Sequence, residues 1–447
     1  MIRKIFKKMM PKEAVWLLPG LEVKRWFFFL IVGTILAVIG FCIIFDLQPI
    51  YHLISLIMRV AGANLIIGRF IGVVLILLGA YVFLKGWKHA NYSILNVNDE
   101  RDRHAVLEDL YRRRKLNHGP KIVALGGGTG LSTMLKGIKN ITNNITAVVS
   151  VGDDGGSSGR LREEMGILPP GDIRNCIAAL ADDEDLVTKL FQYRFTTGSD
   201  LGGHSFGNLF LTAMCEITGD MYRAVMESSK VLSIRGRVLP ATLDDMKLVA
   251  EMEDGSIIKG ESEIPESGKK IKRLFSDPAD CKPLEEVIAA IRDAELIIMG
   301  PGSLFTSVIP NLLIKEIAEE IEKSKAKKLY ICNVMTQPGE TDGFTVSDHV
   351  RTILEHAGNR KIIDTVLVNN YLPEEALEKY KAENSYPVVA DYEELNKLGI
   401  NIFEYRLTDN DSSGYVRHNP SRLMRAVYYW FRKSNKQQEK ENQQNKK

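Results

Sequence analysis

Apolar residues are distributed unevenly along the chain, and two long apolar runs stand near its amino end. Trp26–Phe45 contains no charged residue, and Leu65–Leu84 contains only Arg69. A helix of about 20 apolar residues is long enough to span the ~30 Å hydrocarbon core of a bilayer. The pattern therefore predicts a two-helix transmembrane hairpin within residues 1–90, with spans at about 26–45 and 65–84.

Basic residues flank both apolar runs. The positive-inside rule then places both termini and the main domain in the cytoplasm, with the chain anchored in the cell membrane as a two-span protein. A signal peptide does not fit the first run, which is too long and has no small-residue cleavage site after it. Between the runs, polar residues recur at helical spacing, which predicts a short amphipathic helix in the outer interface of the lipid bilayer. The basic flanks are Arg3, Lys4, Lys7, Lys8, Lys12, Lys24 and Arg25 before the first run, and Lys85, Lys88, Arg101 and Arg103 after the second.

The pattern changes after the second apolar run. Residues 91–119 are polar and charged and form a predicted linker, and Pro120 marks the start of a domain. From 120 to 432, short apolar runs alternate with helical patterns, which predicts an α/β fold with a doubly wound, mostly parallel, Rossmann-like sheet. Short strands from Val238 to Asp277 form a predicted β-rich excursion beside that sheet. Residues 433–447 are almost entirely Lys, Gln, Asn and Glu, a composition typical of a disordered tail.

Charge and cysteine usage narrow the function classes. Lys and Arg number 58 against 56 Asp and Glu, a net charge of +2, so no overall positive field favours a nucleic-acid partner. The five cysteines are scattered and contain no C-x-x-C pair. This argues against a disulfide framework or a zinc site and indicates a reducing compartment.

A glycine-rich loop follows the first apolar run of the domain. Lys121–Leu125 has the pattern of a buried parallel strand, and Leu131–Ile138 has that of a helix. A loop without Cβ atoms lets backbone N–H groups approach a phosphate, and the start of the helix adds a partial positive charge. The predicted phosphate-binding residues are Gly126, Gly127, Gly128, Thr129 and Gly130.

Known phosphate motifs fit this loop only in part. A Walker loop is excluded because no Gly-Lys-Ser/Thr follows the glycines. The Rossmann fingerprint is approximate because Leu131 stands at its third glycine, although Asp153 lies where a ribose-binding acid belongs. An NAD-dependent oxidoreductase is therefore a weaker hypothesis, and a βα turn without a ligand is the structural alternative.

The next apolar run, Ile145–Val151, ends in acids, glycines and hydroxyls. Strands of a parallel sheet deliver such residues to one edge, so this segment joins the predicted site. Asp153 and Asp154 are predicted to hold a divalent metal such as Mg²⁺ against a bound nucleotide. Neighbouring side chains of an extended chain point apart, which leaves open whether both acids reach the metal. The other predicted ligand-binding residues here are Gly155, Gly156, Ser157, Ser158 and Arg160.

Later segments add candidates at the starts of helices and the ends of strands. Asp172 is predicted to cap a helix over Ile173–Leu180, and Ser205 to cap the helix that follows it. A histidine buried in a core is the usual alternative for His204, and no nucleophile–base pair is evident, so catalytic residues stay unassigned. Gln337 and Glu340 lie in a loop that faces either substrate or solvent. The predicted ligand-binding residues are Arg174, Asn175, His204, Asn208, Gly300, Gly302, Ser303 and Asn333.

Five segments occur in one order: GGGTGLST, VGDDGGSSGRLR, PPGDIRN, GHSFGNL and MGPGSLFTSVIPNLL. Together they resemble the YvcK-like gluconeogenesis factors of the 2-phospho-L-lactate transferase (CofD-like) superfamily, over about Lys121 to Leu407. The resemblance implies binding of a nucleotide-linked metabolite such as a UDP-sugar. It also implies a role in cell shape and cell-wall homeostasis during gluconeogenic growth, with cell-wall synthesis proteins and further copies of the chain as expected partners.

The same resemblance leaves a second function open. In the transferase branch the protein would be a metal-dependent enzyme acting on a nucleotide-activated substrate. The run Gly155–Arg160 favours the gluconeogenesis-factor branch, because the transferase branch is more often acidic beyond its first aspartates. Whether the protein turns over its ligand stays open.

Overall fold

The computed structural model describes residues 48–60, 70, 73, 74, 77, 78, 81 and 114–444, except 183, 199, 200, 373 and 411–415. The chain divides into two compact units, Met1–Lys115 and Leu116–Lys447. In the first unit, α3 (Gln48–Val60) confirms the predicted short amphipathic helix. Within the described residues, no helix is both long and apolar enough to cross a membrane. The predicted spans 26–45 and 65–84 lie almost wholly outside those residues, as does most of the linker, so the hairpin stays a prediction.

Seven parallel strands form the central sheet of the second unit, in the order β10-β9-β8-β7-β1-β2-β3. The chain runs outward from β1 through β2 to β3, then returns to β7 on the other side of β1 and continues outward. This confirms the predicted doubly wound, Rossmann-like sheet, with its switch point between β1 and β7. The strands are β1 (Ile122–Gly126), β2 (Ile145–Val149), β3 (Arg237–Pro240), β7 (Leu296–Met299), β8 (Lys327–Ile331), β9 (Thr365–Asn369) and β10 (Asn401–Tyr405).

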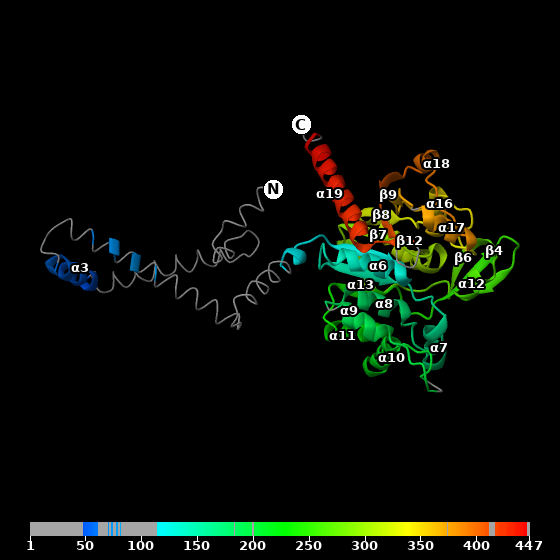
Figure 1. Cartoon of the computed structure of the whole chain (residues 1–447), viewed down its shortest axis with the longest axis horizontal. Coiled ribbons are helices and arrows are strands. Elements are labelled where there is room, and N and C mark those ends of the chain that lie inside the picture. Colours follow the sequence, from blue (N-terminus) through cyan, green and yellow to red (C-terminus); the bar gives the residue numbers. More distant parts are fainter. Residues whose placement is uncertain are drawn as a thin grey trace. The chain divides into compact units, whose positions relative to one another are not determined.

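The central strands are buried along their whole length, as their continuous apolar sequences predict. Every residue of β1, β2 and β7 is buried, which requires helices on both faces of the sheet. Figure 1 shows α8 to α11 gathered on one side of the unit. The helices before β7 are α6 (Gly128–Ile138), α7 (Gly156–Met165), α8 (Gly171–Leu180), α9 (Glu184–Gln192), α10 (Phe206–Thr218), α11 (Met221–Val231), α12 (Glu263–Glu266) and α13 (Glu285–Asp293). Those after it are η2 (Leu304–Val308), α14 (Ile309–Leu313), α15 (Lys315–Lys323), α16 (Val346–His356), α17 (Glu374–Ala382), α18 (Tyr392–Lys397) and α19 (Pro420–Gln444).

The predicted β-rich excursion is confirmed in part, as a separate antiparallel sheet at one edge of the unit (Figure 1). Its predicted first strand, from Val238, instead belongs to β3 of the central sheet. It contains β4 (Lys247–Met252), β5 (Ile257–Lys259) and β6 (Ile271–Asp277). Gly255, in the turn between β4 and β5, has φ +82°, a conformation that glycine adopts without strain. A second hairpin, β11 (Thr408–Asn410) and β12 (Val416–His418), has no counterpart in the predictions from sequence.

The carboxyl end of the chain differs from its prediction. Residues from Lys433 were predicted to be disordered, but α19 continues to Gln444. The first half of α19 buries Leu423, Val427 and Trp430, which anchors the helix. Its second half consists of Lys, Gln, Glu and similar residues, several of which are good helix formers, so the helix continues past its anchored part.

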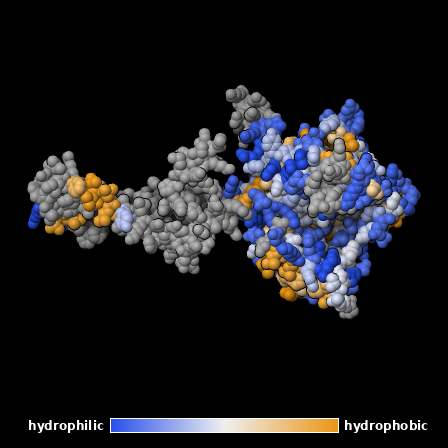
Figure 2. Space-filling model, in the orientation of Figure 1, coloured by the Kyte–Doolittle hydropathy of each residue, from blue (hydrophilic) through white to orange (hydrophobic). Residues whose placement is uncertain are grey.

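Figure 2 shows a mostly hydrophilic face on the second unit, with one apolar patch over the region of α9 to α11. Several large apolar side chains of these helices are exposed: Leu186 and Leu190 in α9, Ile217 in α10 and Val231 in α11. Ile217 is 78% exposed. Contiguous apolar surface of this kind is typical of protein–protein contacts.

Candidate functional site

A cavity of about 770 Å³ lies at the carboxyl ends of β1, β7 and β8. Three loops line it: Gly127–Gly130 after β1, Pro301–Ser303 after β7, and Asn333–Gln337 after β8. This position is the switch point of the sheet, where doubly wound folds bind their ligands. Among the residues predicted in these three loops, Gly126 and Gly300 do not line the cavity. Gly126 ends β1 and Gly300 follows β7.

Two positions of the glycine loop leave no room for a side chain. A Cβ on Gly127 would lie 2.6 Å from Asp172 Oδ2, and one on Gly130 would lie 2.2 Å from the Pro301 carbonyl oxygen. The loops after β1 and β7 therefore pack backbone against backbone. The N-cap residue of α6, Gly127, supplies no side-chain hydrogen bond, so the N–H groups of Thr129 and Gly130 in the first turn can bind a ligand.

Asp172 is not the helix cap that the sequence predicted. Pro170 already has φ −84° and ψ −11°, so α8 begins at Gly171 and Asp172 falls inside its first turn. Its carboxyl group turns toward the glycine loop and accepts a hydrogen bond from the Gly128 backbone. Burial, followed by the charge of Asp153, raises the pKa of Asp172 to about 6. Asp172 thus becomes an acid of the cavity wall.

The two predicted metal ligands point in different directions. Asp153 lines the cavity, but Asp154 accepts the backbone N–H groups of Glu261 and Ser262, each at 2.9 Å. Only Asp153 is therefore placed to meet a metal in the cavity, and Asp154 fixes the turn between β5 and α12 within the excursion. The cause is the alternation of side chains along an extended backbone.

That turn brings Glu261 into the cavity, although no site residue was predicted in this segment. Burial, followed by the charge of Asp153, raises the pKa of Glu261 to about 7. A hydrogen bond with Thr306 acts in the opposite direction but is the smaller effect. Asp153, Asp172 and Glu261 thus repel one another electrostatically. Mg²⁺ is commonly held by one or two carboxylates together with substrate phosphates, and it would relieve this repulsion.

No cluster of three His, Cys, Asp or Glu side chains in the described parts of the chain has the arrangement of a metal site. A cation in the cavity would also need oxygen atoms from the metabolite that binds there. Asp153 and Asp172 are the residues that could contribute carboxylates to it.

The loops after β7 and β8 are joined by side-chain hydrogen bonds. Gln337 Nε2 donates to Ser303 Oγ at 2.8 Å, and Asn333 Oδ1 accepts from the Gly302 backbone at 3.3 Å. Glu340 is also part of this wall, and burial raises its pKa to about 7. The predicted residues Gly302, Ser303 and Asn333, with the candidates Gln337 and Glu340, therefore share one wall.

Another part of the wall is apolar and carries one positive charge. Val334 and Met335 are buried and pack with Tyr380. Arg417 is the single Lys or Arg among the described lining residues, and it comes from β12. Tyr380 and Arg417 were not predicted, because no local pattern links them to residues more than two hundred positions earlier.

The remaining predicted residues form a second cluster that does not line the cavity. Ser157 Oγ lies 2.9 Å from His204 Nδ1 and accepts a hydrogen bond from Asn208 Nδ2 at 3.0 Å. Arg174 donates to Ser205 and to Asn208 Oδ1. The cluster thus contains a hydroxyl–imidazole pair that was not evident in the sequence, since 47 positions separate its members. It comprises Ser157, Arg160, Arg174, Asn175, His204 and Asn208, with Gly155, Gly156 and Ser158 beside it.

Comparison with known proteins agrees with this architecture. Residues 122–408 match the family of 2-phospho-L-lactate transferase CofD. A gluconeogenesis factor of Bacillus subtilis is 53% identical over 68% of this chain and 96% of its own length. The chain belongs to this family. Membership confirms the resemblance seen in the five sequence segments.

Two further relatives define how much of the chain the family shares. A crystal structure of a UPF0052 family member from Bacillus halodurans at 2.60 Å resolution is 50% identical, with a TM-score of 0.66. It covers 68% of this chain and 98% of that protein. A relative from Nostoc sp. is 50% identical over 93% of this chain and 92% of its own length. Some family members thus resemble nearly the whole chain, whereas others correspond to about two thirds of it.

The family match contains most of the cavity. All lining residues from Gly127 to Ser385 fall within residues 122–408, and Arg417 and His418 lie beyond it. The acidic and glycine-rich walls therefore belong to the CofD-like part of the chain.

Proposed function

We propose that this protein binds a nucleotide-linked metabolite, in particular a UDP-sugar, in the cavity between β1 and β7. On this proposal it acts as a gluconeogenesis factor that supports cell shape and cell-wall homeostasis under gluconeogenic growth. The main support for the proposal is that the cavity wall has a phosphate-binding part and an apolar part. Open backbone N–H groups and Arg417 suit phosphates, and the apolar surface at Tyr380 suits a base or sugar ring.

The phosphate part of the proposal rests on the start of α6. Gly127 to Gly130 present backbone at short range, and the helix adds its partial positive charge. Arg417 would provide a planar, permanently charged partner for a phosphate. Mg²⁺ at Asp153 and Asp172 would offset the negative charge of the wall and let phosphate approach these carboxylates.

The ring part of the proposal rests on Tyr380, Val334 and Met335. Aromatic side chains bind the faces of bases and sugars through apolar contact. The cavity volume of about 770 Å³ falls in the range of sites for ligands of this size. A free phosphate or a lone base would leave much of it unfilled.

A metal-dependent transferase of the 2-phospho-L-lactate type is the second candidate. The raised pKa of Glu261, about 7, is suited to a general base near neutral pH. A binding protein needs contacts only to its ground-state ligand, whereas an enzyme must favour a transition state. We propose binding without turnover, because Arg417 and the glycine loop suffice to bind a ground-state ligand.

A titration followed by phosphorus NMR separates these candidates. Full-length protein is mixed with UDP-glucose and Mg²⁺, and the nucleotide resonances are followed over time. Binding without chemistry shifts the resonances and conserves them. Arg417→Ala should weaken the affinity about tenfold, the loss expected for one charged hydrogen-bond donor. Asp153→Asn should also weaken it, while Asp185→Asn, at an exposed position of α9 outside the cavity, serves as the matched control.

Two outcomes would overturn the proposal. Steady release of UDP, UMP or a new phosphodiester, lost in Asp153→Asn, would establish the transferase. Equal affinity of the wild type and Arg417→Ala for UDP-glucose would show that this ligand does not bind in the cavity.

We further propose that the protein is held in the cell membrane by its first unit, with both termini in the cytoplasm, near cell-wall synthesis proteins. The basic flanks of the two apolar runs support this location. The apolar patch over α9 to α11 supports self-association as a homo-oligomer.

A further inference from the structure

Three arginines from different segments surround the loop of residues 202–205. Arg160 of α7 donates from Nη2 to the Gly202 carbonyl oxygen at 3.1 Å. Arg194, which follows α9, donates from Nη1 to the Gly203 carbonyl oxygen at 2.8 Å. Arg174 of α8 donates to the Ser205 hydroxyl. Each guanidinium therefore holds one residue of the same short loop.

None of these three arginines forms an ion pair with a carboxylate of the described residues. Other arginines of the unit do, for example Arg162 with Asp245 at 2.6 Å. Arg174 also has its Nε buried without a hydrogen-bond partner. Arg174 is half-buried, and the charges of Asp172 and Asp153 act on it without a direct ion pair. An anion with several oxygens would satisfy its free donor and would also bind the two exposed arginines beside it.

The positive charges also act on their neighbours. Burial, then the charge of Arg160, lowers the pKa of His204. Burial, then the charge of Arg194, lowers the pKa of Arg174. Like charges are thus concentrated at this loop, although the net charge of the whole chain is only +2.

The cluster is open to solvent and adds uncharged donors. Arg160, Arg194 and Gly203 are exposed. The first turn of α7 lies beside them, and its N-cap residue Gly155 makes no side-chain hydrogen bond. A Cβ on Gly156 would meet nothing within 4 Å, so space is available next to the helix start.

The cluster adjoins the cavity without lining it. Ser157 hydrogen-bonds His204 at the loop, and its neighbour Ser158 lies next to the cavity wall. A Cβ on Gly171 would be 2.4 Å from Ser158 Oγ and 3.1 Å from Asp153 Oδ2. The first turn of α7 therefore separates the arginine cluster from the acids of the cavity.

We propose that the loop 202–205 with Arg160, Arg174 and Arg194 is a second anion-binding subsite, which takes a phosphate or carboxylate group. The group belongs either to a small anion that binds independently or to the far end of the ligand in the cavity. The chemistry of recognition is the same in both cases. The subsite does not depend on the proposed function of the cavity.

Inorganic phosphate is the probe for the test, titrated into the full-length protein and followed by calorimetry. Arg160→Gln and Arg194→Gln each remove one guanidinium and leave the half-buried Arg174 in place. Each should weaken phosphate binding about tenfold, the loss expected for one charged donor. The matched control is Arg223→Gln in α11, an exposed arginine that is ion-paired with Asp220, and it should bind like the wild type. The titration is repeated in Arg417→Ala, which weakens any phosphate binding in the cavity, so that phosphate held at the loop is told apart from phosphate held by Arg417.

Three results would overturn the subsite: no phosphate binding, binding that weakens equally in Arg223→Gln, or binding that weakens only in Arg417→Ala. If no phosphate binds but UDP-glucose still does, the proposed subsite is wrong and the proposed function of the cavity is unaffected. A repeat titration with saturating UDP-glucose distinguishes the two sources. Unchanged phosphate binding identifies an independent anion, and competition together with weaker UDP-glucose binding in Arg194→Gln identifies the far end of the cavity ligand. Both results support the subsite.

Discussion

At the scale of single residues, the protein places carboxyl groups where they resist ionisation. Asp172, Glu261 and Glu340 all have pKa values raised to between about 6 and about 7, and burial is the largest cause for each. Asp172 and Glu261 also interact with Asp153, whereas Glu340 does not owe its raised pKa to another acid. Glu340 is therefore the group on which the effect of burial can be measured alone.

We expect Glu340 to make stability depend on pH. Its pKa rises from 4.5 to about 7 in the folded state. The folded protein therefore binds this proton more tightly than the unfolded chain, and the resulting stability is present below 4.5 and lost as pH rises through about 7. Between about pH 5 and 8, the wild type should lose up to about 3 kcal/mol of unfolding free energy relative to Glu340→Gln.

Urea unfolding at both pH values measures this difference. The exposed Glu163→Gln in α7 is the matched control and should follow the wild type at each pH. Parallel pH profiles for the wild type and Glu340→Gln would show that Glu340 ionises without penalty in the folded protein.

At the scale of elements, the cavity depends on close contact between the starts of α6 and η2. We predict that Gly130→Ala separates them, because its Cβ would lie 2.2 Å from the Pro301 carbonyl oxygen. The expected loss is about 2–4 kcal/mol of stability, together with weaker UDP-glucose binding. Gly126→Ala adds the same methyl group to the same loop, where its nearest neighbour would be Leu131 Cβ at 3.5 Å.

Thermal unfolding and UDP-glucose titration of both glycine variants provide the measurement. Gly126→Ala should remain close to the wild type in both. Equal losses in the two variants would mean that the loop tolerates no added methyl group anywhere, and that its contact with Pro301 has no special importance.

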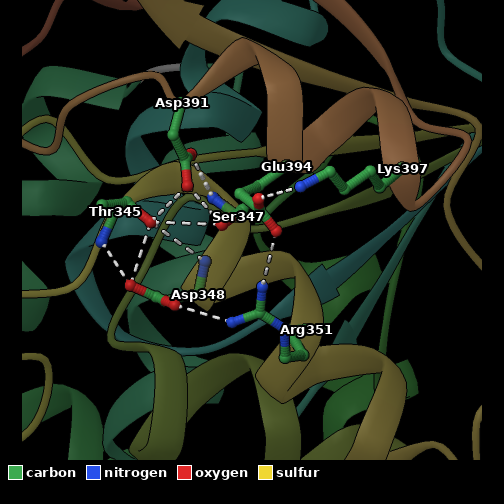
Figure 3. Close-up of polar contacts among 7 residues, drawn as sticks. All are labelled: Thr345, Ser347, Asp348, Arg351, Asp391, Glu394 and Lys397. Atoms are coloured by element: carbon green, nitrogen blue, oxygen red, sulfur yellow. Dashed lines mark hydrogen bonds and ion pairs between the residues drawn. The ribbon is translucent and has the colours of Figure 1, made fainter.

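The start of α16 is fixed by a carboxylate from another segment (Figure 3). Asp391 Oδ1 accepts the Ser347 N–H at 2.9 Å, and Oδ2 accepts from the hydroxyls of Thr345 and Ser347. Burial opposes ionisation of Asp391, but the hydrogen bonds from Ser347 and Thr345 outweigh it and lower its pKa. Thr345 also forms a capping box with Asp348.

We expect Asp391→Asn to reduce the free energy of unfolding by about 1–3 kcal/mol, because charged acceptors hold these donors. Glu394→Gln in α18 is the control shown in the same view. It removes only exposed ion pairs, with Lys397 at 2.6 Å and Arg351 at 3.8 Å, and should change stability by less than about 1 kcal/mol. A larger effect for Glu394→Gln than for Asp391→Asn in urea unfolding would contradict this account.

The elements also show what the sequence can predict. The apolar runs of β1, β2 and β7, each followed by glycines, predicted both the sheet and the edge at which the cavity lies. The alternation of side chains predicted that Asp153 and Asp154 would point apart. Which of them faces the cavity could not be predicted, because Asp154 is held by amide groups more than a hundred positions later. For the same reason Glu261, Tyr380 and Arg417 were missed: tertiary structure alone brings them to the glycine loop.

At the scale of the whole molecule, the second unit corresponds to the relatives from Bacillus, and the first unit is an addition to it. The B. subtilis gluconeogenesis factor aligns with 68% of this chain over 96% of its own length. The cavity, the arginine cluster and the apolar patch all lie in the second unit. Ligand binding should therefore be unchanged by removal of the first unit, whose proposed role is to fix location.

The location predicts a specific topology. Two apolar runs of about 20 residues can each span a bilayer, and basic residues such as Arg25 and Lys85 on their outer flanks remain on the cytoplasmic side. A reporter fused after Lys447 should thus have cytoplasmic activity, and one inserted near Ala63 should be external. Deletion of residues 1–90 should move the protein from the membrane fraction to the soluble fraction with UDP-glucose affinity intact. An external Lys447, or full-length protein that fractionates as the truncated form does, would rule out the hairpin anchor.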